Sequence, residues 1–340
     1  MKAESFQALL AQVPSLTEAQ LDELVLWVEN RRSKTKALRV LESAWGAPKC
    51  GHCASGEVVK NGHSRGLQRY CCRACGKTFN TTTGTPLAGL HSKERFFEQG
   101  ECLAQGLTVR EAAAALGVSV STAFRLRHRF LQAVQAHQPH QFSGLLEADE
   151  TYFRQSQKRS RNVTRASRAR GGKATPKGSA RDLVPVLIGR VRGTHQVSDS
   201  VLTAMTAGQA EDALRTVVGP DTLLCTDGSG ALRTAAARLG VTSKSVAVSY
   251  DGRISEGVYH VQTVNNYHER FKTWVNRQLR GVSTKHLPNY LAWMRLWEWF
   301  KEGIKPEHFV VSGLGKQLIN LRISAHRGRH FRLIVDSISA

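Results

Sequence analysis

Residues 145–152 read Leu145-Leu146-Glu147-Ala148-Asp149-Glu150-Thr151-Tyr152, a strand-like run with acidic residues at its centre. Further strand-like runs lie at 184–191 and 222–226. Helical patterns at 210–218 and 264–280 alternate with these strands, and such alternation is typical of an α/β domain. The sequence therefore predicts an α/β fold over residues 141–303.

A second acid, Asp227, comes directly after the run at 222–226 and before Gly228. Ligands and metal ions collect at the carboxyl ends of strands in α/β sheets. If Asp149 and Asp227 lie on neighbouring strands, they can share divalent cations about 3.5–4 Å apart, which activate water in phosphodiester cleavage. Taken alone, each aspartate is equally typical of a turn or a cap.

The composition bounds the function. The chain has 340 residues with 41% hydrophobic content and 48 Lys and Arg against 27 Asp and Glu, a net charge of +21. That length allows about two domains, and no apolar run of about 18 residues is available to span a membrane. The charge indicates a nucleic-acid partner, and the expected location is the cytoplasm, at the nucleoid. A basic, ribosome-associated protein is the alternative.

Part of this charge is concentrated between the first two strands. Residues 154–181 contain ten basic residues and no acid, together with three glycines. Such a composition cannot bury a core and is typical of a disordered loop. We expect a cationic loop that contacts phosphates.

Five of the seven cysteines lie between residues 50 and 75. Cys50 and Cys53 form one C-x2-C pair, Cys72 and Cys75 form another, and 18 residues separate the pairs. This spacing predicts a zinc ribbon within residues 46–90, with a structural Zn²⁺ because four thiolates leave no open position. His52 and Cys71 are competing ligands, but either would break the paired spacing.

Helical patterns flank the ribbon, in a segment at 1–45 and in a region at 91–140. The second region divides into helices at 93–105, 109–116 and 120–134. The middle helix opens with a capping box, and a turn at 116–119 separates it from the third. This layout predicts a helix-turn-helix.

The third helix has an apolar face and three cations, Arg125, Arg127 and Arg129. We expect these arginines to be exposed and to contact DNA, as a recognition helix in a major groove requires. A plain helical hairpin with a basic, solvated face is the alternative.

In combination these motifs resemble the ISXO2-like transposases of bacterial insertion sequences. The resemblance runs from about residue 50 to residue 299. The matching segments are 61–63, 69–70, 77–80 and 83–87 around the ribbon, and 147–153, 226–228, 260–268 and 280–291 beyond it.

The resemblance implies a ribonuclease H-like fold with a DDE set of metal-binding residues. Asp149 takes the first place, Asp227 the second, and Asn265 stands where the third acid is usual, with Lys272 seven residues on. An amide oxygen can coordinate Mg²⁺ or Mn²⁺ but adds no charge. Glu269, four residues after Asn265 on the same helical face, is the competing third ligand, and His268 lies beside it.

The implied function is metal-dependent cleavage of double-stranded DNA at transposon ends and strand transfer to target DNA, by a homo-oligomer. A DNA-binding regulator that uses only the ribbon and the helix-turn-helix is one alternative, and an inactive, domesticated transposase is another. Residues 304–340 have no assigned role, and 308–311 and 331–335 are expected to be strand-like.

Overall fold

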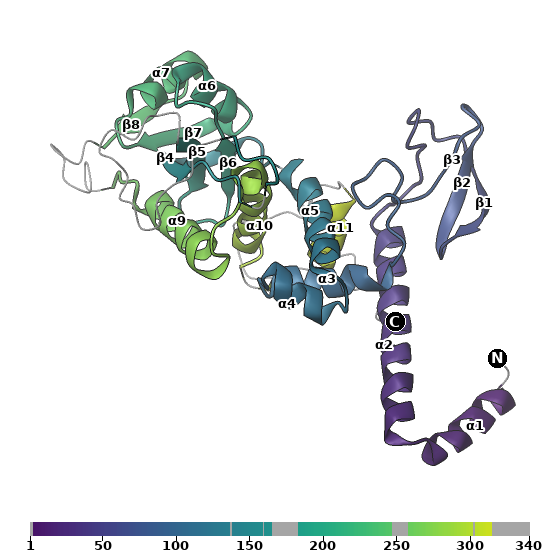
Figure 1. Ribbon diagram of the computed structural model, residues 1–340. Coiled ribbons are helices and arrows are strands. Elements are labelled where there is room, and N and C mark those ends of the chain that lie inside the picture. The colour runs from purple at the N-terminus through teal and green to yellow at the C-terminus, as the bar shows by residue number, and fades with distance from the viewer. Residues whose placement is uncertain are drawn as a thin grey trace. The chain divides into compact units, whose positions relative to one another are not determined.

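The computed structural model describes residues 3–136, 138–158, 160–164, 183–246, 258–301 and 303–314. These residues divide into two compact units: one contains the chain up to Arg127 together with the segment from Lys305, and the other runs from His128 to Ile304 (Figure 1). Most of the predicted cationic loop, from 165 to 181, lies outside the described residues, as does 331–335. In the described part, no helix has the length and apolar character that crossing a membrane requires.

The first unit opens with helices α1 (Ala3–Gln12) and α2 (Glu18–Ser43). The helical prediction for 1–45 is correct, but a 3₁₀ turn at Val13–Ser15 interrupts it. Helix α2 begins after Thr17, whose hydroxyl and backbone form a reciprocal capping box with Gln20. The unit continues with strands β1 (Val58–Ser64), β2 (Leu67–Cys72) and β3 (Thr78–Phe79), and with helices α3 (Glu94–Ala104) and α4 (Val109–Ala115).

The strand-like expectation for 308–311 is wrong. These residues belong to helix α11 (Pro306–Gly313), which opens with a proline at a first-turn position where its missing N–H costs nothing. Phe309 and Val310 are fully buried, and α11 packs against α2 and α3, where Lys36 forms a 2.7 Å ion pair with Glu307. A short apolar run fits a strand or a buried helix equally well, and packing decides between them.

In the described residues the second unit contains a five-stranded mixed sheet with the order β6-β5-β4-β7-β8 (Figure 1). The β4–β5 and β5–β6 pairs are antiparallel, whereas β4–β7 and β7–β8 are parallel. This arrangement confirms the α/β prediction and fits a ribonuclease H-like fold. The strands are β4 (Phe142–Arg154), β5 (Leu183–Val191), β6 (Val197–Val201), β7 (Val218–Thr226) and β8 (Ser243–Ser245).

Strand β4 presents different chemistry to its two faces, because successive side chains point to opposite sides of a sheet. Leu146 and Ala148 join the apolar core under helices α6 (Ala207–Arg215) and α7 (Gly230–Leu239). The alternate residues, including Glu147 and Asp149, point toward α9 (Gln262–Thr273) on the other face. The acidic face of β4 is therefore the face that α9 covers.

Two predicted helices have different bounds in the structure. The helix expected at 210–218 is α6, and Val218 already begins β7. The helix expected at 264–280 is α9, which passes at Trp274 into a π-helical turn ending at Gln278. The Trp274 ring lies 5.0 Å from Trp293 of the next helix, α10 (Leu287–Trp299). Aromatic packing between the two helices thus accompanies the change of helical pitch.

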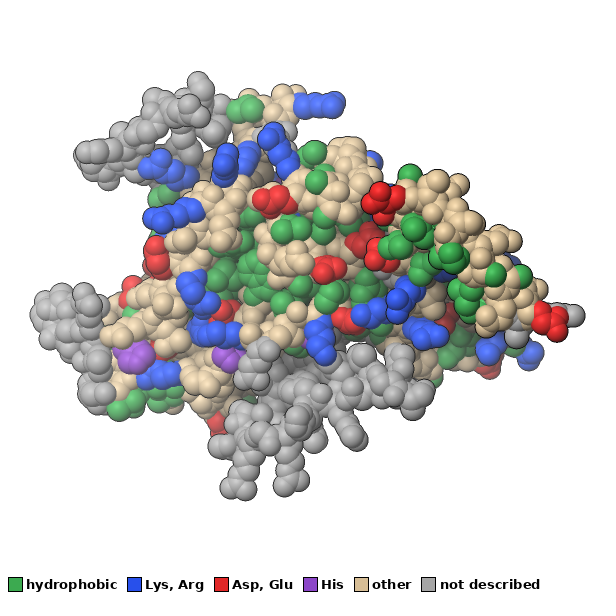
Figure 2. Space-filling model, turned by 90° about the horizontal axis from the view of Figure 1, so that it is seen from below, with side chains coloured by type: hydrophobic (Ala, Val, Ile, Leu, Met, Phe, Trp, Pro, Cys, Tyr) green, Lys and Arg blue, Asp and Glu red, His purple; other side chains and the backbone are tan. Residues whose placement is uncertain are grey.

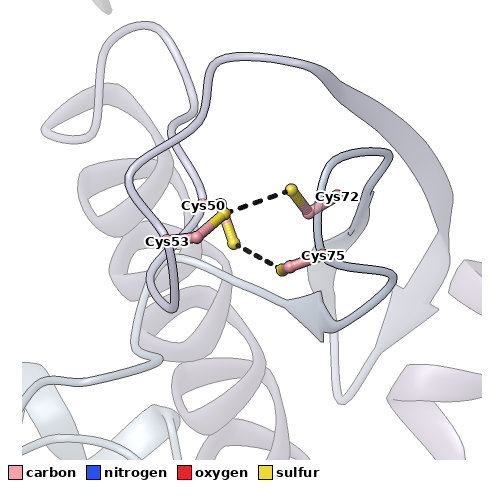
Figure 3. A group of neighbouring side chains, drawn as sticks. All are labelled: Cys50, Cys53, Cys72 and Cys75. Carbon is pink, nitrogen blue, oxygen red and sulfur yellow. Dashed lines mark hydrogen bonds between the residues drawn. The ribbon is translucent and has the colours of Figure 1, made fainter.

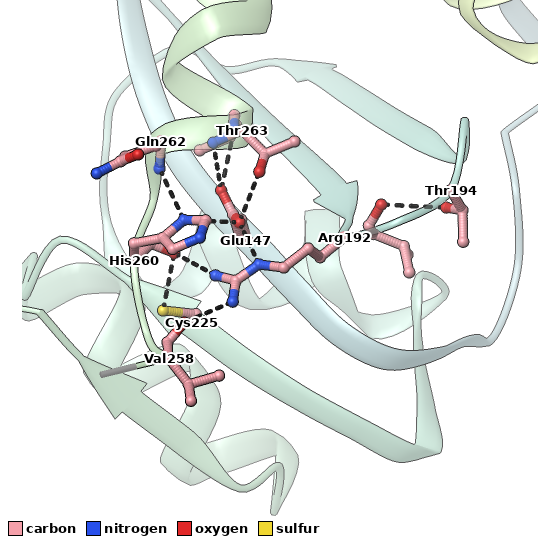
Figure 4. Close-up of polar contacts among 10 residues, drawn as sticks. Glu147, Arg192, Thr194, Cys225, Val258, His260, Gln262 and Thr263 are labelled. Atoms are coloured by element: carbon pink, nitrogen blue, oxygen red, sulfur yellow. Dashed lines mark hydrogen bonds and ion pairs between the residues drawn. The ribbon is translucent and has the colours of Figure 1, made fainter. Parts of the chain in front are cut away.

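The buried carboxylate of Glu147 fixes the start of α9 (Figure 4). It accepts hydrogen bonds from the backbone N–H groups of Thr263 and Val264, at 2.8 and 3.1 Å, and from the Thr263 hydroxyl at 2.9 Å. Those N–H groups belong to the first turn, where a helix has no internal partner for them. The negative charge also complements the positive end of the helix dipole.

Arg192 completes the charge balance around Glu147. Its Nε donates to Glu147 at 2.8 Å, and its two terminal nitrogens donate to the carbonyl oxygens of Val258 and His260 at 2.6 and 2.9 Å. One guanidinium therefore joins β4 to the segment that leads into α9. The position of α9 over Asp149 depends on this contact.

We predict that Glu147→Gln destabilises the protein by about 3 kcal/mol, because it leaves the partly buried Arg192 charge beside a neutral amide. Urea unfolding measures the change. Glu211→Gln is the matched control, since Glu211 pairs with the half-exposed Arg215 and its loss should cost under about 1 kcal/mol. Equal losses for both variants would contradict the assigned role of Glu147.

Candidate metal centres and nucleic-acid interface

The four cysteines predicted as zinc ligands lie together, with all four sulfurs within 4.8 Å of one another (Figure 3). Cys50 Sγ is 3.6 Å from Cys75 Sγ, and Cys53 Sγ is 3.6 Å from Cys72 Sγ. Ligands at a Zn–S distance of about 2.3 Å form a tetrahedron with edges of about 3.8 Å. The sulfur positions therefore fit one tetrahedral Zn²⁺.

Both cysteine pairs sit in turns of the same kind. The N–H of Ala54 donates to the Cys50 carbonyl and that of Gly76 to the Cys72 carbonyl, each at 2.9 Å. Ala54 and Gly76 both have a positive φ, of 60° and 69°. This repetition presents two thiolates from each turn to a common point.

The competing ligands lie apart from this point. Cys71 Sγ contacts the Gly76 carbonyl oxygen at 3.7 Å, and His52 is exposed. Beside the four cysteines, the rings of Trp45, Tyr70 and Phe79 pack with centroids 5.3–5.8 Å apart. This aromatic cluster is small, so a bound ion has a large share in holding the ribbon together.

The second candidate centre lies where β4 and β7 run side by side. Their parallel register pairs Glu147 with Cys225, which sets Asp149 level with Asp227 two residues further on. Asp227 follows the last residue of β7, and its Oδ1 accepts a 3.0 Å bond from the Ser229 N–H. An oxygen of Asp149 and one of Asp227 lie within 4.8 Å of each other. The expected pairing of the two aspartates is thus present.

Glycine is required directly after Asp227. Gly228 has a φ of +91°, and a Cβ built there would lie 2.8 Å from the Ser245 hydroxyl of β8. A side chain at this position would be strained whatever its rotamer. The sharp turn is what brings the Asp227 carboxylate over the strand ends.

Like charges and burial alter the acidity of this centre. Burial, followed by the charges of Asp227 and Glu150, raises the pKa of Asp149 to about 7, while Lys272 opposes the rise. Burial and the charge of Lys272 lower the pKa of His268 to about 4, so this imidazole is neutral at pH 7. His268 Nδ1 lies 3.7 Å from Asp149 Oδ2. The cluster thus carries excess negative charge that a divalent cation would balance.

Helix α9 presents Asn265, His268 and Lys272 at a helical spacing of three and four residues, so they share one face. His268 lies beside Asp149, and the Lys272 charge acts on Asp149, which orients this face toward the acids. Glu269 accepts a 3.3 Å bond from the Thr273 hydroxyl and lines a different surface pocket. The structure thus brings His268 and Lys272 of α9 close to Asp149, and the helical spacing puts Asn265 on the same face, whereas Glu269 bonds to Thr273.

Sequence reasoning missed Glu150 as a member of this centre. One oxygen each of Asp149, Glu150 and Asp227 lies within 4.8 Å of the other two. Strict alternation along β4 sends Glu150 to the opposite face from Asp149. Its place directly after Asp149 was the only signal in the sequence.

Helices α3, α4 and α5 (Val120–Ala136) follow the predicted helix-turn-helix pattern. Thr108 and Glu111 form the expected capping box, with the Thr108 N–H donating to Glu111 Oε2 at 2.7 Å. Arg125 and Arg129 are exposed on α5. The expected exposure of Arg127 is wrong, because its side chain is buried and Nη2 donates to the Leu107 carbonyl oxygen at 2.6 Å.

We predict one Zn²⁺ per chain, lost in the double variant Cys50→Ser, Cys75→Ser together with the fold of the ribbon, because metal binding in such modules is folding free energy. Elemental analysis and limited proteolysis measure both effects. Cys71→Ser removes a neighbouring thiol outside the tetrahedron and should keep the zinc. Absence of zinc from the freshly purified wild-type protein would refute the assignment.

We predict that the metal-free protein loses stability as the pH rises from about 4 to about 7. The folded protein keeps the Asp149 proton up to a pKa of about 7, whereas the unfolded chain releases it near 3.8, so rising pH favours unfolding. The loss is roughly 2–4 kcal/mol. Denaturant unfolding across this range measures it.

Asp149→Asn should flatten this pH dependence, and Mg²⁺ should reduce it in the wild-type protein. The exposed Asp221→Asn, on β7, is the matched control and should keep the wild-type profile. A wild-type profile in Asp149→Asn would show that Asp149 does not carry the effect.

Comparison with known proteins places this geometry in a family. The sequence pattern of the ISXO2-like transposase domain matches residues 141–297, and that of a homeodomain-like domain matches residues 101–134. The second match confirms the helix-turn-helix. An uncharacterized protein in transposable element ISH50 of Halobacterium salinarum is 30% identical over 250 residues, which cover 73% of this chain and 84% of that protein.

Among solved structures, the cryoEM structure of the simian T-cell lymphotropic virus intasome in complex with PP2A regulatory subunit B56 gamma contains a similar chain. It is 12% identical with a TM-score of 0.28, over 58% of this chain and 68% of that one, which is too loose a likeness to bear on function. The family rests on the matched domain, which contains Asp149 and Asp227, and on the ISH50 relative. This chain belongs to the ISXO2-like family of insertion-sequence transposases.

Proposed function

We propose that this transposase cuts DNA at the ends of an insertion sequence and joins the freed 3′ end to target DNA. The observation that carries the proposal is the juxtaposition of Asp149, within β4, with Asp227, directly after the end of the neighbouring β7, in a unit matched by the transposase domain. A regulator that only binds DNA would have no use for a cluster of mutually repelling acids on a face covered by α9.

The donor set suits Mg²⁺ or Mn²⁺, which prefer oxygen ligands. Asp149, Asp227 and Asn265 would hold the cations, and these would supply Lewis acidity and a more acidic water for in-line displacement at phosphorus. Asp149 gives its proton up on binding, since its pKa of about 7 in the free protein reflects burial and neighbouring negative charge. The neutral imidazole of His268 lies beside Asp149 and limits how its carboxylate can turn.

Lys272 has a separate task in this proposal. It shares the α9 face with Asn265, and its ammonium group can contact a DNA phosphate next to the bond that is cut. A fixed cation at that place stabilises the negative charge that builds up on phosphate oxygens in the transition state. Positioning of the DNA by such contacts adds to the rate, since the reacting groups are then held in line.

Affinity for DNA would come from the basic surface. Arg125 and Arg129 on the second helix of the helix-turn-helix are exposed and would contact phosphates or base edges. Lys and Arg side chains also recur across the face of the molecule seen in Figure 2. We propose that the protein acts as a homo-oligomer, because two element ends must be brought together.

We predict that Asp149→Asn and Asp227→Asn each abolish cleavage of DNA containing an element end but leave DNA affinity within about twofold of wild type, because Lys and Arg make the phosphate contacts. A cleavage assay and a gel shift on the same duplex measure the two properties. Asp221→Asn, an exposed aspartate of β7, is the control and should cut normally. Retained cleavage in either site variant would refute the proposed chemistry.

The third ligand is tested by a pair of variants on α9. Asn265→Ala should lower cleavage at least tenfold, and Asn265→Asp should retain activity because it restores a carboxylate at the same place. Glu269→Gln should be as active as wild type, since Glu269 faces Thr273 and a separate pocket. The reverse pattern would make Glu269 the ligand.

A further inference from the structure

Glu150 is placed differently from the other glutamates of β4 and α9. Beyond the Glu147–Cys225 pair, β4 continues without a partner in β7, and the chain turns away at Gly228. The Glu150 carboxylate consequently reaches the same group as Asp149 and Asp227, within 4.8 Å. The Tyr152 hydroxyl acts on this carboxylate, but one of its oxygens, Oε2, is buried and has no hydrogen-bond partner within 3.5 Å among the described residues.

Glu147 and Glu269 show what a satisfied glutamate in this region looks like. Both oxygens of Glu147 accept hydrogen bonds, from Arg192, Thr263 and Val264, so it has no coordination to offer. Glu269 is exposed, bonded to Thr273, and lines a pocket of about 380 Å³ beside Trp274 and Trp297. An unpartnered buried carboxylate oxygen is costly, and a bound ion is one of the arrangements that satisfies such a group.

We propose that Glu150 supplies a third carboxylate to the divalent cations, in compensation for the neutral amide of Asn265. This inference rests on the proposed function. Two divalent ions carry four positive charges, of which Asp149 and Asp227 balance two and a DNA phosphate one. Glu150 balances the remaining charge from a position next to Asp149 in the chain.

The proposal also explains why three acids can share one site in a folded protein. Ionised carboxylates at such short range repel one another and lose hydration, which destabilises the metal-free state. A cation that binds only the folded state recovers this free energy. The acidic cluster is thus a cost in the free protein that metal binding removes.

The test is a titration of Mn²⁺ into the full-length, zinc-loaded protein, in which electron paramagnetic resonance measures the concentration of unbound Mn²⁺. The measurement requires neither DNA nor enzymatic activity. Glu150→Gln should bind Mn²⁺ at least tenfold more weakly than wild type. Glu269→Gln, the same change on an exposed neighbour, should bind as wild type does. Asp149→Asn should bind most weakly of all.

Thermal unfolding without added divalent metal separates a metal ligand from a structural residue. Glu150→Gln should melt at or above the wild-type temperature, because a repelling charge has been removed, and Mn²⁺ should raise its melting temperature less than that of wild type. Glu150→Asp, which keeps the charge on a shorter side chain, should recover part of the affinity.

Wild-type Mn²⁺ affinity in Glu150→Gln would overturn the role of Glu150 and leave the proposed function standing. Failure of the wild-type protein to bind Mn²⁺ in a way that depends on Asp149 would overturn the proposed function, and this inference with it. A melting temperature of Glu150→Gln well below wild type, with an undiminished Mn²⁺ shift, would make Glu150 structural.

Discussion

The parallel pairing of β4 with β7 is the contact on which the candidate metal centre of the second unit depends. Its register sets Asp149 level with Asp227, although 77 residues separate the two in the sequence. Antiparallel pairing on the other edge of β4, with β5, leaves that strand central in the sheet and buried on both faces. Acids on so buried a strand are costly unless each has a partner. Glu147 has Arg192 and the start of α9 as partners, whereas Asp149 and Glu150 lie beside a third acid, Asp227, which repels them.

This division gives neighbouring acids of one strand opposite tasks. Glu147 is saturated with donors and serves to hold α9 in place. Asp149, two residues on and on the same face, has the neutral His268 nearby and a raised pKa. Glu147 fixes the start of the helix that carries Asn265, and Asp149 is the residue that we propose binds a cation. Rigid support under a charged, unsatisfied centre is the usual way in which a protein prepares a metal site.

Much of this could be predicted from the sequence, where local spacing carries the information. The C-x2-C pairs, the capping box at Thr108 and the strand-end position of Asp227 each depend on a few consecutive residues. Arg127 could not be predicted in the same way, because its burial depends on the Leu107 carbonyl lying 2.6 Å away in the folded chain. The helical state of 308–311 is likewise decided by α2 and α3, which are distant in sequence. Glu150 joins the acids only because β7 ends before it.

Anomalous diffraction from crystals soaked in Mn²⁺ tests the central claim most directly, since it locates the ion without any assumption about activity. The zinc predicted at Cys50, Cys53, Cys72 and Cys75 provides an internal reference peak at its own absorption edge. We predict a manganese peak about 2.2 Å from carboxylate oxygens of both Asp149 and Asp227. A clear zinc peak with no manganese density between these two aspartates would contradict the proposal that Asp149 and Asp227 bind a divalent cation.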